Sequence, residues 1–469
     1  MLIYNTLSGR KEELKNTKNR INLFVCGPTV YDYQHIGNAK NYLAFDIIVS
    51  YLRSAGYKIF YLQNITDIDD KIIKRAKEDR VSAIKLANKF IKAYLEDMKA
   101  LGIASVNKYA RATKFIKQIV KQVKTLIDKG YAYKAEDGYY FNIAKFKDYG
   151  KLSRRTAEQA EDGISRIDEG AHKINKGDFC LWKFYKKSTD EASGEPYWNT
   201  FLGIGRPGWH IEDTAITEKF FGAQYDIHGG GLDLKFPHHE AELAQQEAAS
   251  GLKPFVRFWM HSGLLYINGE KMSKSLNNFI TIRDLLKTCP AEVFRYIVLM
   301  HHYRSPINYT DSLLSQARKS LSSIKEFMAK LDFAKAQNSK MKMESRTSIG
   351  SLLKEADGRF MNAMEDDFNT PSALASIFDL MSALQDKVWT LSSSEAGAVR
   401  ISINDKLNAF GLSVRPLKIP NNIVKIGKLR ERARAHKQFI QSDALRKEIE
   451  SLGYKAEDTP IGQFIFRTN

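Results

Sequence analysis

The apolar pattern near the start of the chain predicts a buried strand that runs into a helix. Ile21–Val25 is a short apolar run, and Gly27 and Pro28 interrupt it. Beyond His35, apolar side chains recur at helical spacing, at Ala39, Leu43, Ile47 and Leu52. A turn between a strand and a helix directs backbone N–H groups and the positive end of the helix dipole at the space above it, which suits a phosphate.

The same alternation continues downstream and indicates an α/β fold. Residues 58–64 predict a second strand, and the stretch that begins at Lys71 predicts a long helix. Residues 225–231 predict another strand, which ends in glycines. Strands that alternate with helices in this way are typical of a parallel sheet.

Between these strands the pattern changes, which indicates an insertion. Residues 114–128 predict an amphipathic helix, and residues 130–141 predict a hairpin with Asp137 and Gly138 at its tip. Residues 151–208 are polar and rich in charge. We therefore expect this part of the chain to leave the main sheet.

The C-terminal part of the sequence is helical almost throughout. Apolar residues recur at helical spacing after Pro290, which predicts a helical bundle, and the polar residues 338–346 predict a loop within it. Prolines near 416 and 420 mark a linker to a small basic segment. The helices expected in the bundle and the basic segment are 352–364, 372–388, 395–410, 423–439 and 442–452, with a short strand at 463–466.

Charge and composition narrow the function classes. An excess of 72 Lys and Arg over 54 Asp and Glu gives a net charge of +18 and favours a polyanionic partner, although biased codon usage could also produce it. No window approaches the about 20 apolar residues of a membrane span. The first residues lack a signal-peptide layout, so we expect a soluble, cytoplasmic protein with no membrane partner. The three cysteines are too few and too scattered for a disulfide framework, and Cys180 and Cys289 are expected to be buried thiols.

Two short motifs carry candidate chemistry. In His35-Ile36-Gly37-Asn38, at the predicted helix start, Gly37 would let a flat adenine approach and His35 could donate to a phosphate oxygen. Lys271-Met272-Ser273-Lys274-Ser275 lies in a polar loop, where Lys271 and Lys274 could stabilise the charge that develops on a phosphoryl group. Taken singly, a histidine at a helix start is usually a cap and a lysine-rich loop is usually solvated.

Further motifs accompany these two and make the chain resemble the cysteinyl-tRNA synthetase family. The resemblance covers most of residues 20–310 and returns at the C-terminus. The motifs that carry it, besides the two above, are Cys26-Gly27-Pro28-Thr29-Val30-Tyr31-Asp32, Asn64-Ile65-Thr66-Asp67-Ile68-Asp69-Asp70, Gly205-Arg206-Pro207-Gly208-Trp209-His210-Ile211-Glu212, His228-Gly229-Gly230-Gly231 and Phe236-Pro237-His238-His239-Glu240.

This resemblance implies a class I aminoacyl-tRNA synthetase. Its reaction would activate L-cysteine with ATP and Mg²⁺ to cysteinyl-adenylate and then transfer the acyl group to the 3′ end of tRNA(Cys), and the family suggests a monomer. The implied fold is a Rossmann-type parallel-sheet domain split by an insertion, followed by a helical bundle and a small mixed α/β C-terminal domain. The corresponding domains are residues 1–110 and 204–256 for the two halves of the catalytic domain, 111–203 for the connective insertion, 257–315 for the stem-contact segment with the lysine loop, 316–412 for the bundle and 413–469 for the anticodon-binding domain.

The family also implies one zinc ion per chain that holds the substrate thiolate. A Zn–S bond would separate cysteine from serine, which makes an editing domain unnecessary. The matching ligand positions are Cys26, Asp213, His238 and Glu242. Asp213 departs from the family, which usually has a second cysteine there. A carboxylate keeps the ligand charge but makes the site harder, which leaves open a non-zinc or weakly occupied site.

The remaining expected site residues also follow from the resemblance. Asn38 replaces a more frequent histidine and can donate a hydrogen bond without becoming cationic. Each of three features also has a purely structural interpretation. Trp209 could be plain core, Gly229–Gly231 could only make a tight turn, and the basic C-terminal helix could be a solvated face. The implied roles are catalysis for His35, Asn38, Lys271 and Lys274; ATP binding for Gly37, His228, Gly230, Asp233 and Lys274; cysteine binding for Cys26, Gly27, Thr66 and Trp209; and anticodon recognition for Arg434, Phe439 and Asp443.

Two other functions compete with cysteine–tRNA ligation. A ligase that joins cysteine to a small amine such as an amino sugar would share the pocket but would have no use for residues 415–469. An RNA-binding relative without catalysis would be expected to lose His35 or the lysine loop, and both are present. Aminoacylation of total tRNA with labelled cysteine separates the three hypotheses.

Overall fold

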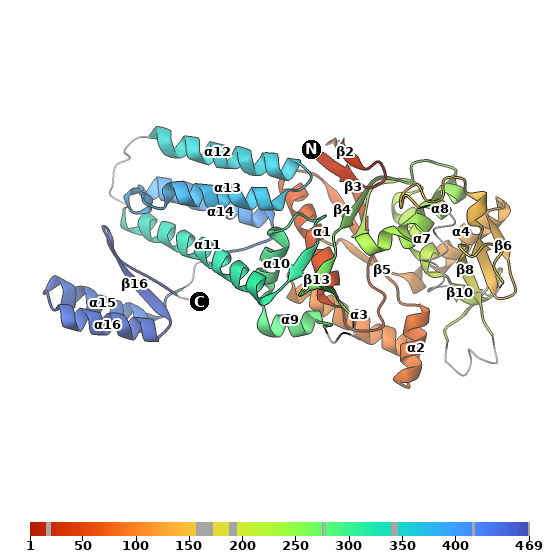
Figure 1. Ribbon diagram of the computed structural model, residues 1–469, viewed down its shortest axis with the longest axis horizontal. Helices are drawn as coiled ribbons and strands as arrows, with labels where there is room; N and C mark the ends of the chain where they lie inside the picture. Colours follow the sequence, from red (N-terminus) through yellow and green to blue (C-terminus); the bar gives the residue numbers. More distant parts are fainter. Residues whose placement is uncertain are drawn as a thin grey trace. The chain divides into compact units, whose positions relative to one another are not determined.

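A computed structural model describes residues 1–15, 20–155, 172–186, 195–273, 276, 278–338, 346–414 and 418–467, with residues 346–348 described by their backbone only. The chain forms two compact units (Figure 1). The first comprises residues 1–291, 301–309 and 366–368, and the second comprises residues 292–300, 310–365 and 369–469.

A five-stranded sheet lies at the centre of the first unit. Its strand order is β12-β11-β3-β4-β5, and all neighbouring strands are parallel, which confirms the predicted α/β fold. The order reverses at β3, because the chain adds strands on one side first and on the other later. Ligands of such sheets bind at the carboxyl ends of the strands at this reversal. The strands are β3 (Ile21–Val25), β4 (Ile59–Ile65), β5 (Lys108–Arg111), β11 (Tyr225–Gly231) and β12 (Val256–Ser262).

Helix α1 (Ile36–Ser54) follows β3 and starts where the sequence predicts. Its predicted apolar positions, Ala39, Leu43, Ile47 and Leu52, are all buried. The helix packs on the sheet through contacts with β4 and β11. The start of α1 is therefore held above the carboxyl end of β3.

The helix predicted from Lys71 onward is wrong in its length, because it is two helices. α2 (Asp70–Glu78) ends just before Arg80, whose φ of 53° leaves the right-handed helical region. Ser82 then starts α3 (Ala83–Ala100) by accepting a hydrogen bond from the backbone N–H of Lys85. A backbone reversal and a new cap thus divide a segment whose apolar periodicity is continuous.

The insertion builds a sheet of its own. This second sheet has the order β6-β7-β8-β10-β9 and is antiparallel throughout, so the predicted hairpin belongs to it. Helices α4 (Ile116–Asp128), α7 (Trp209–Phe221) and α8 (His238–Ser250) contact one another beside it (Figure 1). The strands are β6 (Ala132–Lys134), β7 (Gly138–Phe141), β8 (Phe179–Phe184), β9 (Trp198–Thr200) and β10 (Gly203–Pro207).

Smaller elements complete the first unit. β1 (Leu2–Asn5) pairs with β2 (Arg10–Glu13). A three-stranded sheet combines β13 (Leu265–Ile267), β14 (Glu270–Lys271) and β15 (Ile307–Tyr309), and it carries the start of the lysine loop. The remaining elements are α9 (Ile282–Thr288) and the 3₁₀ turns Ala112–Lys114, Ile143–Lys145 and Leu232–Lys235.

The second unit is the predicted helical bundle with a small C-terminal α/β element. α11 packs against α14, and α12 packs against α13, which confirms the bundle. In the C-terminal element α15 packs on α16, and β16 pairs with β17, of which the sequence predicted only β17. The elements are α10 (Ala291–Leu299), α11 (Asp311–Gln337), α12 (Arg346–Glu365), α13 (Thr370–Leu384), the 3₁₀ turn Val388–Thr390, α14 (Ser393–Ala409), α15 (Asn421–Ala435), α16 (Phe439–Ser451), β16 (Tyr454–Thr459) and β17 (Gly462–Arg467).

Among the described residues, no helix combines the length and apolarity that crossing a membrane requires.

Candidate active site

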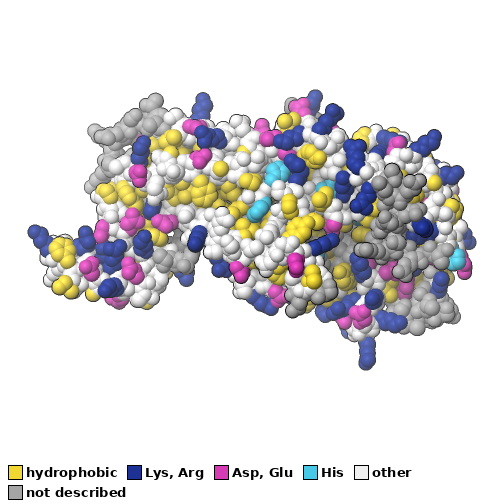
Figure 2. All heavy atoms as spheres, in the orientation of Figure 1, with side chains coloured by type: hydrophobic (Ala, Val, Ile, Leu, Met, Phe, Trp, Pro, Cys, Tyr) yellow, Lys and Arg dark blue, Asp and Glu magenta, His cyan; other side chains and the backbone are white. Residues whose placement is uncertain are grey.

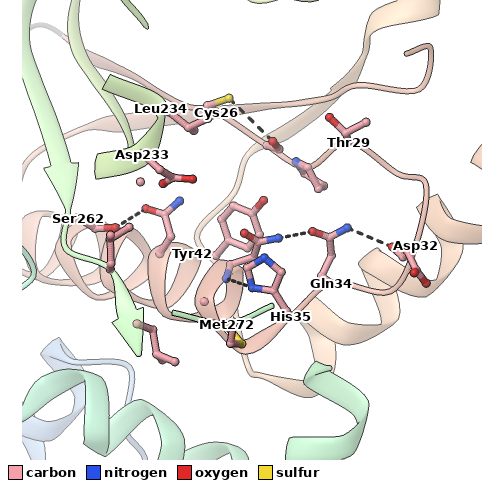
Figure 3. Close-up of a pocket in the computed structure, with 18 of the residues that line it drawn as sticks. Cys26, Thr29, Asp32, Gln34, His35, Tyr42, Asp233, Leu234, Ser262 and Met272 are labelled. Atoms are coloured by element: carbon pink, nitrogen blue, oxygen red, sulfur yellow. Dashed lines mark hydrogen bonds between the residues drawn. The ribbon is translucent and has the colours of Figure 1, made fainter. Parts of the chain in front are cut away.

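A cavity of about 330 Å³ lies at the carboxyl ends of β3 and β11, beside the start of α1 (Figure 3). Its walls come from segments far apart in the sequence, including the turn after β3, the helix α7 and the lysine loop. The predicted site residues that line it are Cys26, Gly27, His35, Gly37, Asn38, Trp209, Asp233 and Lys271. The reversal of strand order therefore coincides with most of the candidate chemistry.

His35 faces this cavity and also caps α1. Its Nδ1 accepts a hydrogen bond of 3.3 Å from the backbone N–H of Asn38, which confirms the helix cap that the sequence offered as an alternative for this residue. Burial lowers the pKa of His35, and the Asp233 carboxylate opposes that shift. A neutral ring that accepts at Nδ1 carries its proton on Nε2, which leaves one donor for a bound ligand.

The Asn38 side chain is partly engaged within the protein. Its Nδ2 donates to Oε1 of Gln34 at 2.6 Å, and Gln34 in turn donates to the backbone oxygen of Asp32 at 3.3 Å (Figure 3). An amide nitrogen has two hydrogens, so one donor of Asn38 remains for a ligand. Gln34, which the sequence did not single out, thereby orients Asn38.

The segment that follows the lysine loop is attached to the start of α1. The backbone N–H of Ile36 donates to the oxygen of Ile280 at 3.1 Å, and that of Ile282 donates to the oxygen of Gln34 at 2.9 Å. Within the loop, Ser273 N–H donates to Oδ1 of Asn278 at 2.8 Å. The cavity also receives the side chain of Met272 (Figure 3), while Lys274 and Ser275 lie outside the described residues.

The glycines at the end of β11, Gly229–Gly231, allow close packing against neighbouring rings, and Gly231 also borders the cavity. A methyl group at Gly229 would meet the Phe45 ring at 2.4 Å, and one at Gly230 would meet the His239 ring at 2.6 Å. Gly231 and Asp233 line the cavity. His228 and Gly230 do not line it.

His228 lies deeper, behind the cavity wall. Its Nδ1 is 2.7 Å from the Tyr225 hydroxyl, and its ring stacks on Trp259 at 4.3 Å. His228, His239 and Glu242 form a second group of potential ligand atoms that lie within 4.8 Å of one another.

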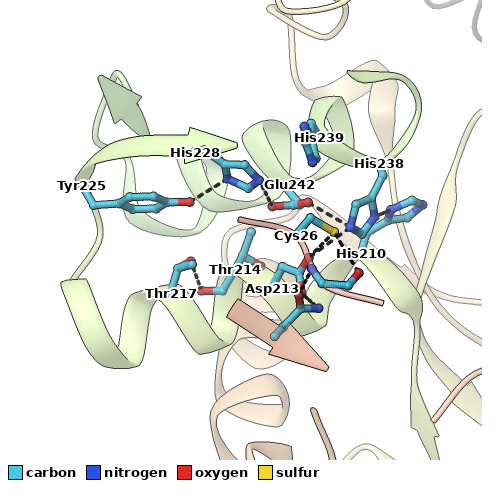
Figure 4. A network of polar contacts seen from close by, with 12 residues as sticks. Cys26, His210, Asp213, Thr214, Thr217, Tyr225, His228, His238, His239 and Glu242 are labelled. Carbon is cyan, nitrogen blue, oxygen red and sulfur yellow. Dashed lines mark hydrogen bonds and ion pairs between the residues drawn. The ribbon is translucent and has the colours of Figure 1, made fainter. Parts of the chain in front are cut away.

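The four predicted metal ligands come together at the ends of β3, α7 and α8 (Figure 4). Ligand atoms of Cys26, Asp213 and His238 all lie within 4.8 Å of one another. Oδ2 of Asp213 is 3.5 Å from the Cys26 sulfur and 3.1 Å from Nε2 of His238. The same Nε2 is 3.0 Å from Oε1 of Glu242, which stands one helical turn along α8.

The electrostatics of this cluster suit a divalent cation. Burial, together with the negative charge of Asp213, raises the pKa of Cys26 and of Glu242 well above their ordinary values. The Glu242 carboxylate faces two imidazole nitrogens, Nε2 of His238 at 3.0 Å and Nε2 of His228 at 3.6 Å, but neither of its oxygens accepts a hydrogen bond from the described residues. Buried acids without donors are costly unless a cation compensates them, so this set of one sulfur, one imidazole and two carboxylates fits zinc.

Trp209 is half-buried and contacts both the cavity and a potential metal ligand. It lines the cavity, and its ring stacks on His238 at 4.0 Å with an interplanar angle of 15°. His210, the next residue, has its Nδ1 2.8 Å from Nδ1 of His238. Both residues of the first turn of α7 thus orient one potential metal ligand.

Thr66 does not reach the cavity lining. Its hydroxyl donates to Oε2 of Glu212 at 3.0 Å, and both side chains are buried. Next to it, Asn64 binds Asp213, a contact that the sequence did not predict. Two adjacent polar residues, Gln63 and Asn64, near the end of a strand predicted to be buried are the signal that could have identified Asn64.

The proposed anticodon residues lie on α15 and α16 in the second unit. Arg434 is exposed and pairs with Asp458 at 3.1 Å, while Phe439 is 58% exposed and Asp443 is also exposed. Basic and acidic side chains are interspersed over these two helices (Figure 2). Arg430 is buried and binds Asp458 through both terminal nitrogens, so the basic helix is only partly a solvated face.

Comparisons with known proteins are consistent with this arrangement. Residues 12–319 match the family model of the catalytic domain of class I (C) tRNA synthetases, and residues 359–412 match the DALR domain. The chain is 42% identical to "Cysteine--tRNA ligase" of Thermococcus gammatolerans, with 98% of each chain covered. It is 39% identical to the protein of the same name from Caldicellulosiruptor saccharolyticus, with all of each chain covered.

Solved structures share the fold at low sequence identity. A Mycobacterium tuberculosis methionyl-tRNA synthetase in complex with methionyl-adenylate superposes with a TM-score of 0.61 at 16% identity, over 84% of this chain and 89% of that one. A leucyl enzyme of Agrobacterium radiobacter, in a ternary complex titled "LeuRS-tRNA-LeuAMS", gives a TM-score of 0.64 at 12% identity, over 83% of each chain.

Proposed function

This chain belongs to the cysteine–tRNA ligase family of class I aminoacyl-tRNA synthetases, and we propose how its residues divide the work. The enzyme activates L-cysteine with ATP and transfers it to tRNA(Cys). In the first step the cysteine carboxylate attacks the α-phosphorus, and the bond to the departing diphosphate breaks. In the second step a ribose hydroxyl of the tRNA 3′ end attacks the acyl carbon, and AMP leaves.

In our proposal the start of α1 and the lysine loop handle ATP. His35 donates from Nε2 to a phosphate oxygen, Asn38 adds one amide donor, and Gly37 admits the adenine. Lys271 and Lys274 stabilise the charge that builds on the phosphoryl oxygens, and Mg²⁺ neutralises the diphosphate. Asp233 binds the ribose, with Gly230 and His228 shaping the turn from behind. The hydrogen bonds between the start of α1 and the segment after the loop support this division.

The buried cluster beside the same cavity selects the amino acid. Cys26, Asp213, His238 and Glu242 would hold zinc, which supplies a bond to the substrate sulfur that serine cannot form. Gly27 and Trp209 would border the amino acid, while Thr66 acts indirectly through Glu212. The observation that carries the proposal is that Cys26, one member of this cluster, and His35 line the same cavity.

In the second unit, Arg434, Phe439 and Asp443 would read the anticodon, with Phe439 stacking on a base. Their exposure on α15 and α16 supports this role. We further propose that the enzyme works as a monomer, which size-exclusion chromatography with light scattering tests.

Three assays on one preparation test the proposed function. We expect cysteine-dependent exchange of labelled diphosphate into ATP, charging of total tRNA with cysteine, and about one zinc per chain by elemental analysis. Exchange without charging would favour a ligase for small amines, and neither reaction would favour an RNA-binding protein. Full activity in protein without zinc would overturn the metal assignment while leaving the ligase function intact.

A further inference from the structure

We propose that Asn64 is a positioning residue that makes Asp213 bind the metal through one oxygen only. The inference rests on the proposed metal site and goes beyond it. It concerns how this chain accommodates an aspartate at a position where the family resemblance leads us to expect cysteine. Its basis is the buried carboxamide of Asn64, which hydrogen-bonds both to Gly27 and to Asp213.

Asn64 lies near the end of β4 and is 1% exposed. Its Oδ1 accepts a hydrogen bond of 2.5 Å from the backbone N–H of Gly27, the residue after Cys26. Its Nδ2 donates to Oδ1 of Asp213 at 2.5 Å. Because a backbone N–H can only donate, the amide oxygen must face Gly27 and the NH₂ group must face the carboxylate. One side chain therefore connects the turn that carries one ligand to the side chain of another.

Because of this contact, the two oxygens of Asp213 have different partners. Oδ1 accepts from Asn64, whereas Oδ2 points at the cluster, 3.5 Å from the Cys26 sulfur and 3.1 Å from Nε2 of His238. A carboxylate without such a donor could use both oxygens on one ion. With one atom from each of the four protein residues, the substrate thiolate would be the fifth ligand of the ion, and a second oxygen of Asp213 would compete for that fifth position. Asn64 thus preserves the position that the cysteine thiolate requires.

The proposal predicts energetic coupling between Asn64 and Asp213. A cysteine at position 213 would offer one sulfur and no second ligand atom, so Asn64 would have no oxygen to hold. The hydrogen bond from Gly27 exists whichever residue occupies position 213. A double-mutant cycle therefore separates the positioning of Asp213 from any general support of the Cys26 turn.

The experiment compares the full-length wild type with Asn64→Leu, Asp213→Cys and the double variant, each stripped of metal and reloaded with Co²⁺. Metal affinity is measured by competition with a chromophoric chelator. In the wild-type background we expect Asn64→Leu to weaken binding by about 10-fold to 100-fold, the range of outer-shell effects. In the Asp213→Cys background the same change should cost less than about threefold, because the coupled partner is gone.

Two spectroscopic signals test the number of ligand atoms directly. Five-coordinate Co²⁺ absorbs more weakly in the visible range than tetrahedral Co²⁺, so Asn64→Leu should lower the d–d intensity of the protein without substrate. Added L-cysteine should raise the sulfur-to-cobalt charge-transfer band in the wild type and raise it less in Asn64→Leu. If Asn64→Leu does not fold, Asn64→Ala provides the same comparison with a smaller side chain.

The outcomes distinguish the inference from the function it rests on. Equal loss of affinity in both backgrounds would overturn the inference, since Asn64 would then act only through Gly27 and Cys26. Unchanged d–d and charge-transfer bands in Asn64→Leu would overturn it too. A wild type that binds no metal would overturn the proposed metal site, and with it the inference.

Discussion

Lys40 is a buried ammonium group on α1 whose only hydrogen bonds among the described residues go to backbone oxygens. It is 1% exposed and donates to Gly263 at 2.7 Å and to Tyr303 at 2.8 Å. Gly263 borders the active-site cavity, just before β13 and the lysine loop. The Lys40 amino group thus links the segment just before that loop to α1, the helix that His35 caps. Burial lowers the pKa of Lys40 to about 7.

This depressed pKa gives a testable dependence of stability on pH. Between pH 7 and the unfolded pKa of about 10.4, the unfolded chain holds a proton on Lys40 that the folded chain lacks, so stability rises with pH there. The slope for one group is at most about 1.4 kcal/mol per pH unit. Lys40→Met should lack this gain in stability with pH. The Tm of the wild type should therefore rise relative to the Tm of the variant between pH 7 and pH 9.5. A constant difference would contradict the assignment.

Cys26 is the one sulfur in the proposed metal site. We expect Cys26→Ser to lower zinc affinity by at least about tenfold and to raise KM for cysteine more than KM for ATP, because serine is a poor zinc ligand. Zinc content and diphosphate exchange measure these effects. Cys180→Ser, at a buried cysteine outside the cavity lining, is the matched control and should leave zinc content unchanged.

At the scale of elements, the ends of helices and loops follow local chemistry. Ser392 begins α14 with a reciprocal capping box, in which its side chain accepts from the backbone N–H of Glu395 and the Glu395 carboxylate accepts from that of Ser392. The positive φ of Arg80 prevents α2 from continuing, and the Ser82 side chain caps the start of α3. Such boundaries depend on single residues that a hydrophobic pattern does not reveal.

The capping box makes a quantitative prediction. Ser392→Ala should lower the free energy of unfolding by about 1 kcal/mol, because the backbone N–H of Glu395 loses the side-chain oxygen that accepts from it. Ser393→Ala, one residue later, removes a hydroxyl without removing the cap and should have little effect. Urea unfolding followed by circular dichroism measures both variants, and equal losses would contradict the cap's role.

The lysine loop makes a kinetic prediction at the same scale. Lys271→Ala should lower kcat for diphosphate exchange by at least about tenfold and change KM for ATP much less, because the ammonium is expected to act on developing charge. Lys287→Ala, at an exposed lysine on α9, is the control and should be near wild type. A loss confined to KM would indicate ground-state binding instead.

At the scale of the whole molecule, the two units are expected to contribute separate steps. The net charge of +18 favours association with a polyanion, and the proposed anticodon residues lie in the second unit, away in sequence from the motifs of the cavity. Amino-acid activation needs only the first unit's site. Charging of tRNA should need both.

A substitution in the second unit tests this separation. Arg434→Ala should raise KM for tRNA by about tenfold or more, the scale of one lost base contact, and leave diphosphate exchange unchanged. Arg432→Ala, at an exposed arginine on the same helix, is the matched control with a smaller expected effect. If both variants raised KM for tRNA equally, Arg434 would contribute only positive charge and would not recognise an anticodon base.

The sequence by itself determined the parallel α/β sheet, the strand-to-helix unit around His35, the bundle and eight of the residues that line the cavity. These follow from periodicity and from motifs, which depend on neighbours in the chain. Tertiary structure alone decided that 132–134, 138–141, 179–184, 198–200 and 203–207 form one separate sheet, and that His228 lies behind the cavity wall.

Tertiary structure also decided how Asp213 and Lys40 are held. Asn64 reaches Asp213 across 149 positions of sequence, and Lys40 reaches the oxygen of Gly263 across 223. Hydrogen bonds between such distant residues exist only once the sheet has brought their backbones together, and no local pattern encodes them. The sequence resemblance was enough to propose Asp213 as a metal ligand, but Asn64, the residue that orients it, could be identified only from the fold.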